Sequence, residues 1–137
     1  MISQLLLNDK KVLFRTAKVT PTKIGQFVTL WKRIENSTIA PFDTTDAIDL
    51  VIIQVKTNNH SGLFVFPISV LIEQAIISTQ KKEGKRAFRV YSPWDKTINK
   101  QAQKSQQWQL NYFLNLPLSS SENLDSKEEY IRILDQL

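Results

Sequence analysis

The chain has 137 residues, with 18 basic and 13 acidic side chains, no cysteine, one histidine and three glycines. This length favours one domain, because domains cluster at about 100–150 residues, and the missing cysteines exclude disulfide frameworks, thiolate metal sites and cysteine nucleophiles. One histidine disfavours multi-histidine metal sites and serine–histidine triads, and the three isolated glycines form no phosphate-binding loop motif.

The first half of the chain predicts β-structure, because short apolar or alternating runs are separated by turn residues. We expect strands over residues 4–7, 11–19, 26–34, 48–55 and 63–66. We expect Asn8-Asp9-Lys10 to form a hairpin turn between the first two of these strands. Residues 35–47 carry no periodic signal and are expected to form a loop. The run 48–55 is almost continuously apolar, which is typical of a central strand covered on both faces.

The second half predicts two helices and one further strand. Residues 69–75 are expected to form a short helix with Ser69 as its N-cap, followed by a polar, basic loop. Residues 87–91 predict a strand that ends before a proline. The segment from Thr97 or Asn99 to about Leu114 lacks glycine and proline and is rich in glutamine, alanine and lysine, so it predicts a helix.

The last twenty residues differ in composition from the rest. Pro117 and the serines at 119–121 indicate a linker, and Ser126-Lys127-Glu128-Glu129 is a capping-box sequence that predicts a final acidic helix. We therefore expect one domain over residues 1–117, with the linker and acidic helix of residues 118–137 packed on it. The fold class is α+β: a curved, pseudobarrel-like antiparallel sheet of five or six strands with two or three flanking helices.

Three blocks of sequence resemble the MepB-like family. They are FRTAKVTPTKIGQFVTLWKR (14–33), GLFVFPISVLIEQAIIS (62–78) and GKRAFRVYSPWDKTINKQAQKSQQWQLNYF (84–113). The resemblance runs from about residue 11 to residue 116, with the blocks in order and at matching distances. The family is named for a gene beside a multidrug efflux pump and its transcriptional regulator. The resemblance implies neither an established reaction nor a catalytic residue set.

Positive charge is concentrated in one segment of the chain. Residues 81–104 hold eight basic and two acidic side chains, whereas residues 118–137 hold two basic and five acidic ones. Such a local field attracts polyanions. Within the basic segment Trp94 is a candidate for stacking on an unpaired base. Lys100 and Lys104 are spaced i, i+4 on the expected helix, with Gln103 and Gln107 beside them, so lysines and amides share one face.

These features predict a non-enzymatic nucleic-acid-binding protein, with DNA favoured over RNA, that uses a basic sheet-and-helix surface and no cofactor. A second basic set lies on and around the strands expected at 11–34. No apolar run approaches the roughly 20 residues of a membrane span, and the first residues do not form a signal peptide, so we expect cytoplasmic localisation and no membrane partner. The residues assigned to binding are Arg15, Lys18, Lys23, Lys32, Arg33, Lys85, Arg86, Arg89, Trp94, Lys96, Lys100 and Lys104.

Two other functions stay open at this point. In the first, aromatic side chains of the expected sheet line a small-ligand cavity in an accessory protein linked to multidrug resistance; these are Trp31, Phe64 and Phe66. In the second, an acidic cluster faintly resembles the PD…(D/E)xK pattern of Mg²⁺-dependent nucleases, with a glutamine in place of one carboxylate. Its members are Asp43, Asp46, Asp49, Gln54 and Lys56.

Overall fold

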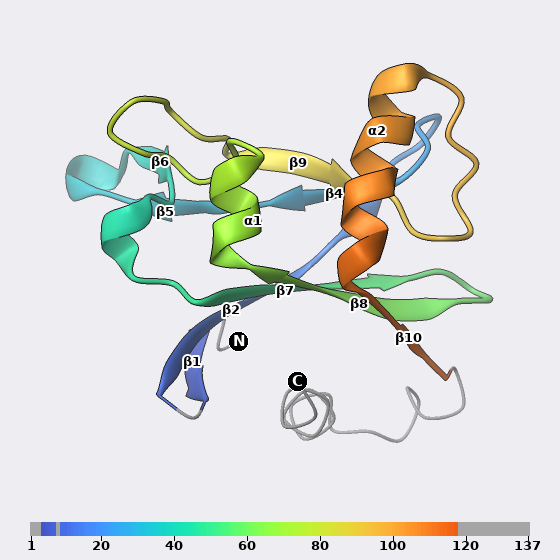
Figure 1. Cartoon of the computed structure of the whole chain (residues 1–137), viewed down its shortest axis with the longest axis horizontal. Helices are drawn as coiled ribbons and strands as arrows, with labels where there is room; N and C mark the ends of the chain where they lie inside the picture. The colour runs from blue at the N-terminus through green and yellow to red at the C-terminus, as the bar shows by residue number, and fades with distance from the viewer. Residues whose placement is uncertain (1–3, 8, 118–137) are drawn as a thin grey trace.

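Strands dominate the computed structural model, which describes residues 4–7 and 9–117 (Figure 1). The acidic helix expected within residues 118–137 lies outside the described residues. The largest sheet has the order β1-β2-β7-β8-β10. Its strands are β1 (Gln4–Leu7), β2 (Lys10–Thr16), β7 (Leu50–Lys56), β8 (Ser61–Pro67) and β10 (Phe113–Leu116). The predicted α+β class is therefore confirmed, but this sheet is mixed and not antiparallel throughout as predicted, because β2 runs parallel to β7.

The remaining strands form two smaller sheets. One has the order β3-β4-β9, and the other pairs β5 with β6. These strands are β3 (Lys18–Val19), β4 (Gln26–Thr29), β9 (Ala87–Val90), β5 (Trp31–Arg33) and β6 (Ile39–Pro41). The helices are α1 (Ile68–Glu73) and α2 (Lys100–Gln109), with short 3₁₀ turns at Glu35–Ser37, Thr44–Asp46 and Leu110–Tyr112. Neither α-helix of this part of the chain has the length and apolarity to cross a membrane.

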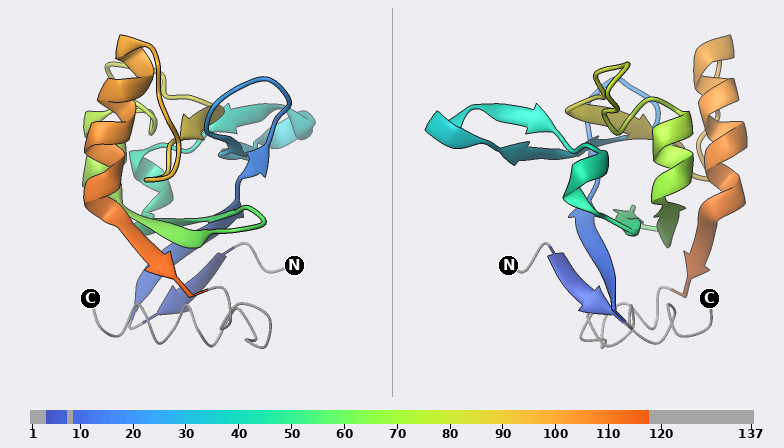
Figure 2. Two further views of the ribbon diagram at one scale, coloured as in Figure 1. Left: turned by 90° about the vertical axis from the view of Figure 1, so that its right-hand side faces the viewer. Right: turned by 60° about the vertical axis from the view of Figure 1, so that its left-hand side comes forward.

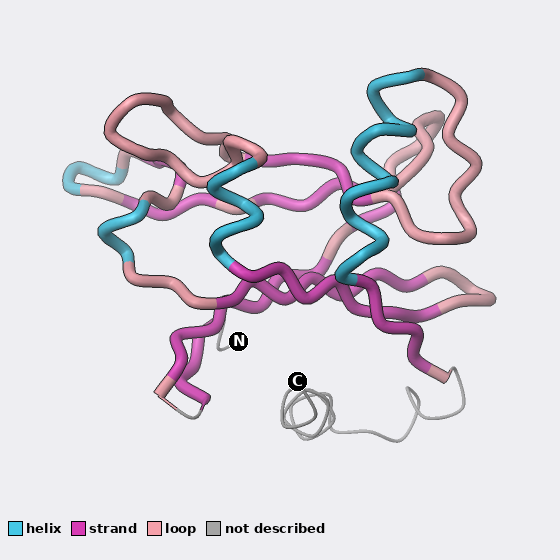
Figure 3. The backbone as a smooth tube through the Cα atoms, in the orientation of Figure 1, coloured by secondary structure: helices cyan, strands magenta, loops and turns pink. Residues whose placement is uncertain are grey.

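The two larger sheets form opposite layers of the domain. In Figure 1 the sheet that contains β4 and β9 lies above the five-stranded sheet, and α1 and α2 run between the two layers. Figure 2 shows both helices on the same side of the molecule. The loop between α1 and β9 lies at the end of α1 remote from the five-stranded sheet (Figure 3). The loop between β9 and α2 runs beside α2, and its Trp94 contacts His60 and Phe113. These loops and helices frame the candidate site.

The apolar run of residues 48–55 forms the central strand, as predicted. β7 pairs antiparallel with β8 and parallel with β2. Val51 and Ile53 face Phe66 and Phe64 across the ladder in the main core, and all four are 0% exposed. Ile52, which points to the opposite face, is also buried, in a second apolar cluster. Burial on both faces explains why the run shows no polar alternation.

Two strands predicted as continuous are instead divided between sheets. The first breaks at Ala17, whose N–H donates to the carbonyl of Gln54 at 2.9 Å, and the second breaks at Leu30, whose N–H donates to the carbonyl of Arg86 at 2.8 Å. Both residues are buried. At each, the chain leaves one sheet and enters another without a polar turn, so the pattern of apolar residues does not mark the change.

Three further predictions differ from the structure. Residues 35–47, expected as a loop, contain β6 and two 3₁₀ turns. Ser69 is not the N-cap of α1, because that helix begins at Ile68 after Pro67, with no side-chain capping bond. The long helix ends at Gln109 rather than near Leu114, because the following residues pair with β8 as an edge strand. Pairing with β8 outweighs the modest helix propensity of these residues.

Gly62 provides the space in which β10 packs on β8. A Cβ at this position would lie 2.2 Å from Cζ of Phe113, whose ring also packs edge-on against Phe64. We expect Gly62→Ala to lower the free energy of unfolding by about 1–3 kcal/mol through overpacking. Urea denaturation measures this, with Asn115→Ala, at an exposed residue of β10, as the control, expected to change stability by less than about 0.5 kcal/mol. Equal stability of the two variants would contradict the close packing.

Candidate functional site

Gln109 joins α2 to the edge of β9. Its buried side-chain amide donates through Nε2 to the carbonyl of Arg89 at 2.9 Å and accepts at Oε1 from the N–H of Tyr91 at 2.8 Å. β9 is the last strand of its sheet, so these backbone groups have no neighbouring strand to pair with. The glutamine amide satisfies both of them, as a strand residue would. It thereby fixes where α2 lies along β9.

A second glutamine of α2 holds the loop between β9 and the helix. Nε2 of Gln106 donates to the carbonyls of Ser92 and Asp95 at 2.8 and 2.9 Å, and its Oε1 accepts from the Thr97 hydroxyl at 3.0 Å. One turn earlier, Gln103 donates to the carbonyl of Thr97 at 3.3 Å. Gln103, predicted to present its amide beside the lysines, therefore contributes to loop structure.

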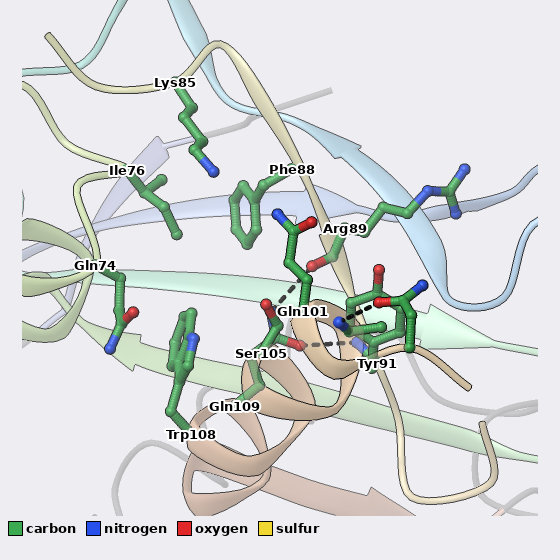
Figure 4. Close-up of a pocket in the computed structure, with 12 residues that line it drawn as sticks. Gln74, Ile76, Lys85, Phe88, Arg89, Tyr91, Gln101, Ser105, Trp108 and Gln109 are labelled. Carbon is green, nitrogen blue, oxygen red and sulfur yellow. Dashed lines mark hydrogen bonds between the residues drawn. The ribbon is translucent and has the colours of Figure 1, made fainter. Parts of the chain in front are cut away.

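Two adjoining pockets lie along α2 and β9. The first, of about 330 Å³, lies between the end of α1, β9 and α2, and the second, of about 380 Å³, lies between the loop of residues 20–25, β9 and the start of α2. Arg89, Tyr91, Asn99 and Ala102 line both, so the two form one concave surface, which we call the groove. Figure 4 shows the first pocket, with Lys85, Gln101 and Trp108 around it.

The groove is lined by positive charge only. Its charged lining residues are Lys23, Lys85 and Arg89, and no carboxylate lines either pocket. Neither lysine makes an ion pair within the described residues. Arg89 donates to neutral acceptors, so its charge is not cancelled by a carboxylate. A concave surface with uncompensated positive charge concentrates anions from solution.

Arg89 also positions the loop that forms one wall of the groove. Its guanidinium donates to the carbonyls of Ile24 and Gly25 at 3.3 and 3.2 Å and to the hydroxyl of Thr20. Within this loop Thr22 has φ of +70°, a conformation that is strained for a β-branched residue. Gly25 has φ of +83°, and a Cβ there would meet the ring of Tyr91 at 2.7 Å. The loop thus keeps a demanding conformation beside the groove.

An exposed aromatic side chain lies between two cations on the adjacent sheet face. Lys18 on β3 is in register with Phe27 on β4, which is in register with Arg89 on β9, so the three side chains share one face. Phe27 is 39% exposed, and the Arg89 guanidinium lies 6.0 Å from its ring centroid. The sequence did not predict this exposed aromatic side chain, because the alternation of apolar residues places Phe27 on a strand but does not show that its ring is exposed.

The remaining cations predicted for binding fall into two groups. Lys96, Lys100 and Lys104 are exposed on and beside α2. The other four are in contact with neighbours: Lys32 pairs with Asp43 and Asp46, Arg86 pairs with Glu83, Arg33 lies over the ring of Trp31, and Arg15 is half-buried over the ring of Phe42. Burial lowers the pKa of Arg15. The structure therefore brings only part of the predicted basic set to the groove.

The aromatic residue at the groove is not the tryptophan that the sequence suggested for base stacking. Trp94, predicted to stack on a base, stacks on His60 with ring centroids 4.6 Å apart and contacts Phe113 edge-on, and its Nε1 is buried without a hydrogen-bond partner in the described structure. Trp108 lines the groove instead. Phe64 and Phe66 are completely buried in the main core, so the small-ligand cavity expected at these residues is not formed there.

The acidic residues that resembled a nuclease motif make contacts that support the fold and do not gather at one site. Asp43 and Asp46 both bind Lys32, and Asp49 accepts a hydrogen bond from the backbone N–H of Lys11 at 2.8 Å. Asp49 precedes β7 and Lys56 ends it, so the two lie about 23 Å apart at roughly 3.3 Å per residue. Within residues 4–7 and 9–117, no three histidine, cysteine or acidic side chains are grouped to hold a metal ion.

Comparison with known proteins identifies a family and a similar solved structure. The family model described as MepB-like matches residues 2–115. A solved structure, described as the crystal structure of MepB, is 40% identical, with a TM-score of 0.79, and the match covers 82% of this chain and 75% of that one. No curated protein matches the chain significantly.

Because of the contacts among Lys32, Asp43 and Asp46, we expect the free energy of unfolding to depend on pH. Hydrogen bonds from the Thr45 hydroxyl and then from Lys32 lower the pKa of Asp43 below its usual 3.8. A lowered pKa in the folded state stabilises the protein above pH 3.8, and this contribution is lost as the pH falls through the folded pKa. We therefore expect Asp43→Asn to reduce the free energy of unfolding at pH 7 by up to about 1 kcal/mol.

Urea denaturation between pH 2 and pH 7 measures this effect. The difference between wild type and Asp43→Asn should shrink toward the acid end, whereas Asp9→Asn, at an exposed turn residue, should follow the wild type throughout. A difference that stayed constant down to pH 2 would contradict the assignment.

Proposed function

The chain belongs to the MepB-like family, and we propose that it binds nucleic acid, with DNA as the preferred partner, through the groove between α2, β9 and the loop of residues 20–25. The observation that carries this proposal is the charge of the groove. All three charged residues that line it are basic, and no carboxylate lines it. A nucleic-acid backbone supplies the missing negative charge, with one phosphate for each nucleotide.

The surroundings of the groove favour an extended anion. Lys100 and Lys104 are exposed on α2, Lys96 is exposed just before it, and Lys18 is exposed on the sheet face beyond Arg89. These cations extend the positive charge beyond the two pockets. A small anion would use one or two of them, whereas a nucleic-acid strand passes several phosphates along such a surface.

Phe27 adds a contact that a nucleic acid can use. It is 39% exposed between Lys18 and Arg89, and sequence-independent binders combine cations with exposed aromatic side chains in this way. The proposed interface contains fewer cations than the sequence analysis assigned to it. Lys32 and Arg86 are paired with carboxylates, so we assign them no phosphate contact. The proposed contacts are Lys18, Lys23, Lys85, Arg89, Lys96, Lys100 and Lys104.

Fluorescence anisotropy with labelled DNA at several salt concentrations tests the proposal. We expect log K to fall linearly with log salt concentration, with a slope of about −0.9 for each phosphate contacted on a duplex. Lys23→Ala combined with Lys85→Ala should weaken binding and make the slope shallower by about 1 for each lysine removed. These side chains are exposed and without ion pairs in the described structure, so folding should be unchanged.

The control removes the same charge elsewhere. Lys10 and Lys56 are exposed and line neither pocket, so Lys10→Ala combined with Lys56→Ala should keep most of the affinity. Equal losses in both double variants would show that binding follows net charge and not the groove. The absence of binding at about 50 mM salt would contradict the proposed function itself.

A further inference from the structure

The first pocket of the groove has polar side chains with unused hydrogen-bonding capacity. Gln74, Gln101, Ser105 and Lys85 all line it, from the end of α1, from α2 and from the loop before β9. Among the described residues, none of these four side chains makes a hydrogen bond or an ion pair. By contrast, Gln103, Gln106 and Gln109 on the same helix all bond to the protein. Two side-chain amides with no partner among the described residues, those of Gln74 and Gln101, therefore line this pocket.

Aromatic rings form the apolar part of the same pocket. Trp108 packs on Phe66 in the core, with ring centroids 5.4 Å apart, and is only partly buried, so it also lines the pocket. Phe88 and Tyr91, on and after β9, complete this lining (Figure 4). The volume of about 330 Å³ is at the lower end of the range for small-molecule sites. A flat ligand with polar edges fits this combination.

The chemistry of the lining selects a nucleotide among flat ligands. A glutamine amide has a donor and an acceptor side by side, which matches the hydrogen-bonding edge of a base. Base rings stack on aromatic side chains, and a lysine ammonium binds phosphate. Since no carboxylate lines the pocket, its charge disfavours cationic ligands. We propose that this pocket receives one unpaired nucleotide unit, with its base at Trp108, Gln74 and Gln101 and its phosphate at Lys85.

This inference rests on the proposed function and adds to it a preference for unpaired nucleotides over continuous duplex. A base inside a duplex is stacked on both faces and has its pairing edge occupied, so it does not enter a pocket unless it is unpaired or extruded. The protein should therefore prefer single strands, strand ends and bulges to continuous duplex. A free mononucleotide presents the same chemistry as a unit of a strand, so the test must distinguish the two sources.

The decisive ligands are two labelled DNA hairpins that differ by one base. One carries a single extrahelical adenosine, and the other carries an abasic site at that position, so both present the same number of phosphates. Anisotropy titrations with the full chain should give about 5- to 100-fold tighter binding of the adenosine hairpin, from stacking and hydrogen bonding of one base. Equal affinity for the two hairpins would overturn the inference.

Variants locate the base in the pocket. Gln74→Ala combined with Gln101→Ala removes two amides that bond to nothing in the described structure, so folding should be unaffected. We expect this variant to lower the ratio of the two affinities at least threefold while the abasic hairpin binds as before. Gln107→Ala, an exposed residue of the same helix that does not line the groove, should keep the ratio. Loss of affinity for both hairpins in equal proportion would overturn the assignment.

The outcomes also separate this inference from the function on which it rests. Salt-sensitive binding of both hairpins with a ratio of one would leave the proposed function intact and overturn only the pocket. Competition by adenosine monophosphate identifies the source of the unit. Weak competition, with a Kd far above that of the adenosine hairpin, supports a unit within a strand. Competition as strong as that of the hairpin would assign the pocket to free nucleotides and would overturn the inference that it receives a unit of a strand.

Discussion

The arrangement of the candidate site depends on the buried amide of Gln109. Backbone groups at the edge of a sheet must find partners when they are buried, and Arg89 and Tyr91 at the edge of β9 find theirs in this one side chain. Because both atoms of the amide are used, α2 is held at one position along the strand. The width of the groove, the exposure of Trp108 and the placement of the helix lysines all follow from this contact.

Much of the fold follows from the sequence because burial leaves a local pattern. The first hairpin, the central strand at 50–56 and its partner at 61–67 were predictable from turn residues and continuous apolar runs. The changes of sheet at Ala17 and Leu30 were not, since β-strands in different sheets share the same period of two. The early end of α2 was hidden for a related reason: the partner of β10 is β8, more than forty residues away in sequence.

The positive charge of the candidate site was predictable from the sequence, but which of its cations pair with carboxylates was not. The excess of lysine and arginine over residues 81–104 is a property of the sequence, and Lys85 and Arg89 of that segment do line the groove. Which cations keep their charge uncompensated is decided by contacts across the fold, as when Lys32 meets Asp43 and Asp46. In the same way, only tertiary packing distinguishes Trp94, covered by His60, from Trp108, which lines the groove.

The glutamines of α2 have a thermodynamic consequence. A helix that docks through apolar contacts alone can shift between neighbouring packings at little cost, whereas amide hydrogen bonds are directional and hold one register. Gln103, Gln106 and Gln109 give α2 such a directional attachment to the chain around β9. The groove is therefore preorganised, and little conformational entropy remains to be lost when its walls close on a ligand. The contacts with the ligand then contribute more fully to affinity, because ordering the site costs little free energy.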